Sequence, residues 1–191
     1  MFKLRINKIV LDLHSAWQRR NQVGEFEGII ISDPGKDHAN FLSVIQAALL
    51  LIKKTDPRRL ELVKRHIRLV WNVKLWPAGA QYTHHNQTCT IDFKHLVQHG
   101  DKEWWIGACA CILIHEATHG RIHSRGIGYT PELRKRIERL CVCEENRFVF
   151  RLTLTKPTLA DSLHQKFDPS KWERSWNTTP MEQIKELLKW W

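Results

Sequence analysis

The chain has 191 residues, of which 42% are hydrophobic and 26% are charged. This length suits one domain with a substantial core, and no uninterrupted apolar run approaches the roughly 20 residues that a membrane-spanning helix needs. The composition is that of a globular protein and excludes a transmembrane segment. We therefore expect a single domain over residues 1–191.

Thirty Lys and Arg residues against twenty Asp and Glu give a formal net charge of +10. Such a surplus favours weak, nonspecific binding to nucleic acid, but the basic residues are spread in short pairs and are not gathered in one arm. Five cysteines cannot all pair within the chain. In the first fifteen residues of the chain, charged residues interrupt the apolar ones before a signal-peptide core can form. Reduced thiols and a cytoplasmic location are the resulting expectations.

The first half of the chain predicts both strands and helices. From residue 37 onward, apolar residues recur at spacings of three and four, which predicts a helix buried along one face. Pro57 can open a second, shorter helix that runs to about residue 64. Short stretches that are rich in β-branched residues or alternate between apolar and polar predict strands at residues 4–13, 25–31, 67–75 and 88–93.

Two longer helices are predicted in the second half, over about residues 103–123 and 131–152. Asp101 can cap the first helix, whereas Thr130 and Pro131 form a strong start for the second. The short loop between them favours an antiparallel pair. Beyond residue 157 the pattern is weaker, although an amphipathic helix after Thr179 can dock on the core.

His115, Glu116 and His119 form an HExxH sequence within the first of these two helices. Residues four apart in a helix lie one turn apart on the same face, so both imidazoles can bind one zinc ion. Glu116 adjoins His115 and can reach a zinc-activated water instead of the metal. Zinc lowers the pKa of such a water to about 7, so we expect Glu116 to act as the general base of a hydrolysis without a covalent intermediate.

The sequence IHEATHG at residues 114–120, followed by a helix from Pro131, resembles the zincin metallopeptidases and, within them, the gluzincins. The resemblance implies an α+β, zincin-like single domain, in which a small mixed sheet packs on the active-site helix and an antiparallel helix follows. It also implies one Zn2+ per chain, a third ligand that is a Glu of the next helix, and a peptide or protein substrate. Residues 88–93 are then the expected edge strand beside the substrate.

Three residues are candidates for the third ligand, and Glu138 is favoured. If the two helices form an antiparallel hairpin, Glu138 lies nearly level with His119, and its spacing occurs in part of the gluzincin group. Glu145 lies about 10.5 Å further along the same face, which suits contact with a ligand better than contact with the metal. His123 lies about 12 Å from His115 in a straight helix, too far for one ion.

The cysteines form two pairs, Cys109 with Cys111 and Cys141 with Cys143. Helical residues two apart point about 200° away from each other, so neither pair can hold one ion, and we expect small apolar core residues.

A donor that stabilises the transition state is also expected, and Tyr129, His84 and His85 are candidates between which the spacing does not select. The leading hypothesis is a zinc metallopeptidase or peptidase-like hydrolase. The alternative is a catalytically inactive zincin-like protein or a basic regulatory module that binds nucleic acid or a protein partner.

Overall fold

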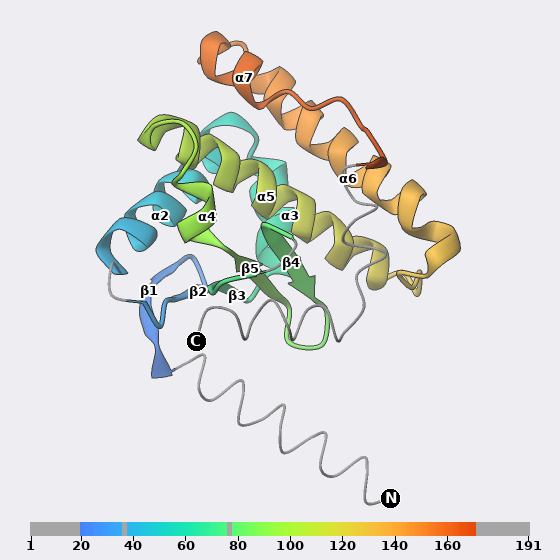
Figure 1. Ribbon diagram of the computed structural model, residues 1–191, viewed down its shortest axis with the longest axis horizontal. Helices are drawn as coiled ribbons and strands as arrows, with labels where there is room; N and C mark the ends of the chain where they lie inside the picture. Colours follow the sequence, from blue (N-terminus) through green and yellow to red (C-terminus); the bar gives the residue numbers. More distant parts are fainter. Residues whose placement is uncertain (1–19, 36–37, 76–77, 171–191) are drawn as a thin grey trace, which may run out of the picture.

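The strands of the chain form one five-stranded mixed sheet in the computed structural model, which describes residues 20–35, 38–75 and 78–170 (Figure 1). The spatial order is β1-β2-β3-β5-β4, in which β2, β3 and β5 run parallel while β1 and β4 run antiparallel to their neighbours. The strands are β1 (Gln22–Phe26), β2 (Ile29–Ser32), β3 (Leu69–Asn72), β4 (Ala80–Thr83) and β5 (Thr88–Ile91).

Two expectations about the strands are wrong. Residues 25–31 do not form one strand, because Glu27 and Gly28 take positive φ angles of 46° and 88° and turn the chain into the β1–β2 hairpin. The edge strand on the side of β5 is β4, which the sequence did not predict, whereas residues 88–91 pair on both sides, with β3 and β4. The strand predicted at residues 4–13 and the helix predicted after residue 179 lie outside the described residues.

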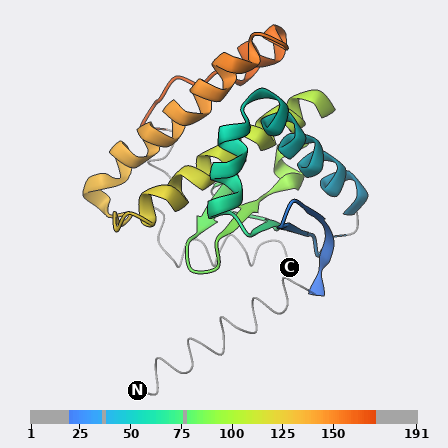
Figure 2. The same cartoon turned by 180° about the vertical axis from the view of Figure 1, so that it is seen from behind.

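The helices lie together on one side of the sheet (Figures 1 and 2). The four helices predicted within the described residues are present as α2, α3, α5 and α6, and two short helices, α4 and α7, were not predicted. None of the described helices is long and apolar enough to cross a membrane. The helices are α2 (His38–Thr55), α3 (Pro57–His66), α4 (Phe93–Leu96), α5 (Lys102–His123), α6 (Pro131–Leu152) and α7 (Pro157–Leu163).

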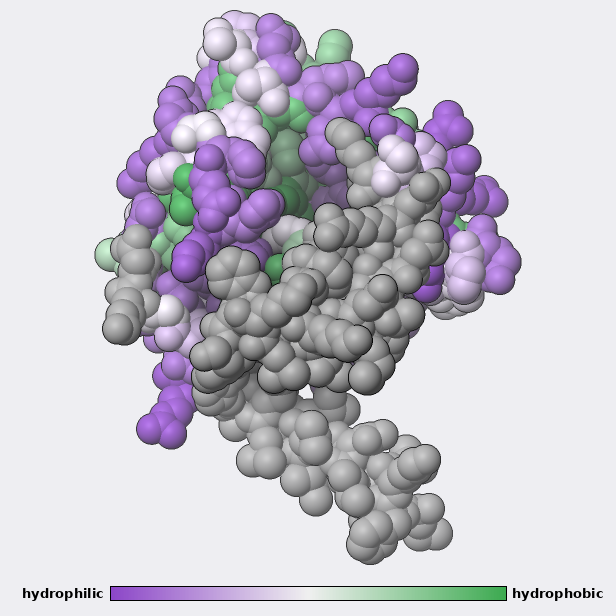
Figure 3. All heavy atoms as spheres, viewed as in Figure 1, coloured by the Kyte–Doolittle hydropathy of each residue, from purple (hydrophilic) through white to green (hydrophobic). Residues whose placement is uncertain are grey.

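Helix α5 is the centre of the fold, since it packs against α2, α3, α6 and α7 as well as β4 and β5. Seen from behind, α2 and α3 lie in front of it (Figure 2). The Asp101 carboxylate accepts a hydrogen bond from the Trp104 backbone N–H at 2.9 Å, which caps the start of α5 as expected. On the opposite side, which Figure 1 also shows, most of the visible surface of the described residues is hydrophilic, and apolar residues are visible mainly near the centre, over α5 (Figure 3).

Gly120 allows the last turns of α5 to approach the edge of the sheet closely. A Cβ atom at this position would lie 2.7 Å from the His66 Cβ and 2.8 Å from the Tyr82 hydroxyl. The Tyr82 hydroxyl donates a hydrogen bond to the His66 carbonyl at 2.9 Å, which ties β4 to the end of α3. The HExxH segment, which ends one residue before Gly120, is therefore held next to the edge strand.

Candidate metal centre

His115 and His119 face α6 from consecutive turns of α5, with ring centroids 5.0 Å apart. Both rings are largely buried, with 14% and 16% of the side-chain surface exposed. The helix thus brings the two imidazoles together as the four-residue spacing predicts.

Glu138 of α6 lies against both imidazoles. Its Oε2 is 3.1 Å from His115 Nε2, and its Oε1 is 3.6 Å from His119 Nε2. Two atoms that each lie about 2.0–2.2 Å from one tetrahedral zinc ion are roughly 3.3 Å apart. The carboxylate of Glu138 therefore lies where a third ligand of an ion bound to both imidazoles would lie, level with the two histidines as the helical hairpin predicts.

Glu145 contacts the other nitrogen of the first histidine. Its Oε1 lies 2.5 Å from His115 Nδ1, while its Oε2 accepts a hydrogen bond of 3.4 Å from the Gln165 side-chain amide. A carboxylate on the second nitrogen of a metal-binding histidine fixes the tautomer and orientation of the ring. This contact leaves His115 Nε2 directed toward Glu138, and it matches the role that the sequence favoured for Glu145.

His123 lies away from the cluster that is formed by His115, His119, Glu138 and Glu145. It is exposed, and its ring stacks on His84, which follows the end of β4, with ring centroids 4.2 Å apart. The alternative in which His123 is the third ligand thus finds no geometric support.

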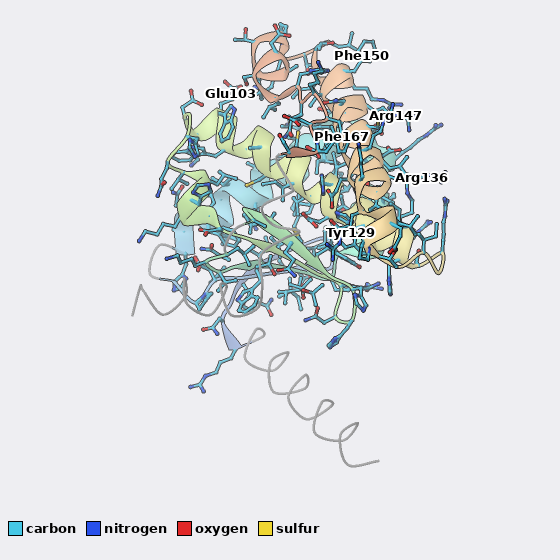
Figure 4. The ribbon with its side chains drawn as sticks, turned by 45° about the vertical axis from the view of Figure 1, so that its right-hand side comes forward. Glu103, Tyr129, Arg136, Arg147, Phe150 and Phe167 are labelled. Atoms are coloured by element: carbon cyan, nitrogen blue, oxygen red, sulfur yellow. The ribbon has the colours of Figure 1, made fainter. Side chains whose placement is uncertain are left out.

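Tyr129 is the candidate donor that lies at the cluster. Its hydroxyl donates to Glu138 Oε1 at 2.5 Å, and its ring centroid is 5.6 Å from that of His119. The side chain is 45% exposed and lies near the start of α6 (Figure 4), whereas His84 and His85 are both exposed beyond β4. The Tyr129 side chain therefore reaches from the solvent-exposed surface to the Glu138 carboxylate.

Cys141 is the residue of the cluster that the sequence did not identify. Within the described residues, donor atoms of His115, His119 and Cys141 all lie within 4.8 Å of one another, a group that does not include Glu138, whose two oxygens each approach one of the two imidazoles. All five cysteines are free thiols, and Cys143 is exposed, which corrects the expectation that it is a core residue. In the sequence, the spacing of three residues between Glu138 and Cys141 indicates that both lie on the same face of α6, and this spacing could have identified Cys141.

Burial and charge shift the pKa values in the cluster in opposite directions. Burial raises the pKa of Glu116 to about 7, partly opposed by His115. Burial, aided by His115, lowers the pKa of His119 to about 4. Burial alone would lower the pKa of His115, but Glu145 and Glu138 outweigh it and raise this pKa well above the usual range. Glu138 and Glu145 thus favour a positive charge on His115, which lies between them, whereas burial keeps His119 neutral.

Glu116 is 5% exposed and lies one turn before Gly120, on the face of α5 that meets Tyr82 of β4. Its charge contributes to raising the pKa of Tyr82 on β4 to about 12, where burial is the larger cause, and also acts on Cys89 of β5. Glu116, the general base expected from the sequence, thus lies between the two histidines and the strands β4 and β5.

Comparison with protein-family models, curated proteins and solved structures finds no match. The chemistry of the cluster must therefore be inferred from its own residues.

Proposed function

We propose that this chain is a zinc-dependent metallopeptidase or peptidase-like hydrolase whose site resembles that of the gluzincins. In this proposal His115, His119 and Glu138 bind one Zn2+, and Glu116 is the general base. The observation that carries the proposal is the position of Glu138, whose two carboxylate oxygens lie 3.1 Å and 3.6 Å from the Nε2 atoms of the two HExxH histidines.

The donor set suits zinc. Two imidazoles and one carboxylate are the ligands of several catalytic zinc sites, in which three protein donors leave one position open. They favour zinc over manganese, which prefers oxygen donors. When bound, zinc would supply a Lewis acid that polarises a carbonyl group and lowers the pKa of water.

The chain's own residues would orient the ligands and move a proton. Glu145 holds His115 through Nδ1, and Tyr129 holds Glu138 through a hydrogen bond to one carboxylate oxygen. Glu116 makes no hydrogen bond to His115, His119 or Glu138 and lies toward β4. Its carboxylate can therefore accept a proton from water and pass it to a leaving amine.

The edge strand suggests how a substrate would bind. Within the described residues β4 pairs with β5 on one side only, and it lies beside α5 close to Glu116. An extended peptide can add to such an edge through main-chain hydrogen bonds. We therefore favour a peptide or an extended protein segment as the substrate.

Replacement of the general base tests the proposed function. The wild type, screened against a peptide library after zinc loading, is expected to cleave at least one sequence, and Glu116→Gln is expected to lose most of that activity while it keeps its zinc. Glu103→Gln, an exposed carboxylate on the same helix, is the matched control and should stay active. Full activity of Glu116→Gln on the same peptide would rule out the mechanism.

A basic helix face favours binding of nucleic acid as a second candidate function. Arg136 and Arg147 project outward from α6 (Figure 4). Binding to DNA that disappears at moderate salt would indicate nonspecific charge alone, whereas tight, sequence-selective binding would favour this candidate. The exposed charged residues of this face are Lys135, Arg136, Arg139, Arg147 and Arg151, against the single acid Glu132.

A further inference from the structure

Cys141 is placed differently from the other buried cysteines. It lies one turn after Glu138 on α6, fully buried, and its sulfur is within 4.8 Å of donor nitrogens of both His115 and His119. Glu138 and Cys141 thus approach the same two imidazoles from the same helix face. Cys143 lies two residues further along and is exposed.

A core role accounts for the burial of Cys141 but not for its direction. It packs with Ile122 and Ile137 in a small apolar cluster, and free cysteines are often found in such places. A side chain that serves only to fill space has no reason to face two imidazoles from a position between Glu138 and Glu145, the two carboxylates that contact His115. Cys109 is equally buried, yet it belongs to no such group of donors, and Glu138, which is also outside the group, is tied to the site by its own contacts with both imidazoles.

The chemistry of the group suits a thiolate ligand. Zinc binds Cys sulfur at about 2.3 Å and His nitrogen at about 2.0–2.1 Å, so both atoms lie roughly 3.6 Å apart around one tetrahedral ion. The Cys141 sulfur lies within 4.8 Å of a nitrogen of each imidazole, and rotation about the Cα–Cβ bond is the one movement that adjusts its position.

We propose that Cys141 donates its sulfur to the ion that His115, His119 and Glu138 hold, which makes four protein donors in the resting protein. The proposal rests on the metal site of the proposed function. On binding, the S–H proton passes to solvent and the thiolate ligates the metal. Four protein ligands are typical of closed sites, whereas catalytic sites keep one position open. Cys141 therefore competes with water and substrate for the open position and holds the site latent until it leaves the ion.

Cobalt substitution tests this proposal without any substrate. We expect Co2+ bound to the wild type and to Cys143→Ser to show the charge-transfer absorption of a thiolate ligand, and Co2+ bound to Cys141→Ser to lack it. Circular dichroism checks that each variant is folded. The zinc affinity of Cys141→Ser should fall by at least about tenfold, because even partners of metal ligands contribute about 10- to 100-fold. The affinity of Cys143→Ser should not change.

The outcomes separate the two proposals. If the wild type binds cobalt but shows no thiolate band, or if Cys141→Ser keeps the band, Cys141 is not a ligand. Either result leaves the three-ligand site standing. Failure of the wild type to bind cobalt or zinc overturns both. If Cys141→Ser does not fold, X-ray absorption of the zinc-loaded wild type decides, with one sulfur neighbour at about 2.3 Å as the expected result and none as the contrary one.

Discussion

Glu138 and His115 are joined across the α5–α6 interface, with Oε2 of the carboxylate 3.1 Å from Nε2 of the imidazole. The second nitrogen of the same imidazole contacts Glu145, seven residues further along α6. His115 is therefore held between two carboxylates of one helix, which fixes its orientation from both sides.

Glu145→Gln should weaken metal binding without abolishing it. The amide cannot accept the His115 N–H as strongly as the carboxylate, so the tautomer and the orientation of the ring are less well defined. Zinc affinity, measured by competition with a chelator, is expected to fall about 10- to 100-fold with the stoichiometry unchanged. Complete loss of zinc from this variant would instead identify Glu145 as the third ligand in place of Glu138.

Tyr129→Phe should loosen the Glu138 carboxylate. The variant loses the hydrogen bond of 2.5 Å to Oε1 but keeps the ring beside His119. A hydrogen bond to a charged group contributes about 1.5–3 kcal/mol when buried, and the exposure of Tyr129 reduces this, so we expect a loss of zinc affinity of up to about tenfold. An unchanged affinity together with a reduced kcat would assign Tyr129 to the substrate and not to Glu138.

Gly120→Ala should destabilise the fold. Alanine favours a helix over glycine by about 1 kcal/mol, but the new Cβ would lie 2.8 Å from the Tyr82 hydroxyl, which its hydrogen bond to His66 holds in place. Overpacking of this kind costs about 1–3 kcal/mol, and so we expect a lower midpoint of thermal unfolding. Gly79→Ala, whose Cβ would meet nothing within 4 Å, is the control, and equal midpoints for both variants would contradict the close approach.

Glu144 provides a pH-dependent contribution to stability. Burial alone would raise its pKa, but Arg121, Arg59 and Arg147 outweigh it and hold the pKa below the usual 4.5. A carboxylate with a lowered pKa in the folded state stabilises that state fully above about pH 4.5, and this stabilisation is lost as the pH falls through the folded pKa.

Glu144→Gln should therefore reduce the free energy of unfolding at neutral pH by about 1–3 kcal/mol, and the difference from wild type should shrink below pH 4.5. Urea unfolding at several pH values measures both. Glu61→Gln removes an exposed carboxylate that pairs with Lys64, and we expect it to change little. If the difference in the free energy of unfolding between Glu144→Gln and wild type does not vary with pH, this would contradict the lowered pKa of Glu144.

The sequence predicted the central helices and the position of Glu138 because local rules determine both. Apolar spacing and the start at Pro131 locate α5 and α6, and the four-residue spacing of His115 and His119 places two rings on one face. A short loop then makes the helices antiparallel, which brings Glu138 level with the histidines.

The order of the strands could not be predicted in this way. Strand pairing is non-local, and periodicity reports that one face is buried without reporting which neighbours cover the edges. Strand β4 has the sequence AQYT with little alternation, so neither its existence nor its edge position was apparent. Cys141 was not predicted for another reason: its spacing of two from Cys143 points the two thiols apart, and the ligand role of Cys141 depends on its spacing of three from Glu138.

Elemental analysis of the purified protein tests the central claim most directly. We expect about one zinc per chain in the wild type and in His123→Ala, a histidine one turn beyond the site, and little zinc in His119→Ala and Glu138→Ala. A wild-type chain that contains no zinc and takes none up on exposure to the metal would contradict the proposed site.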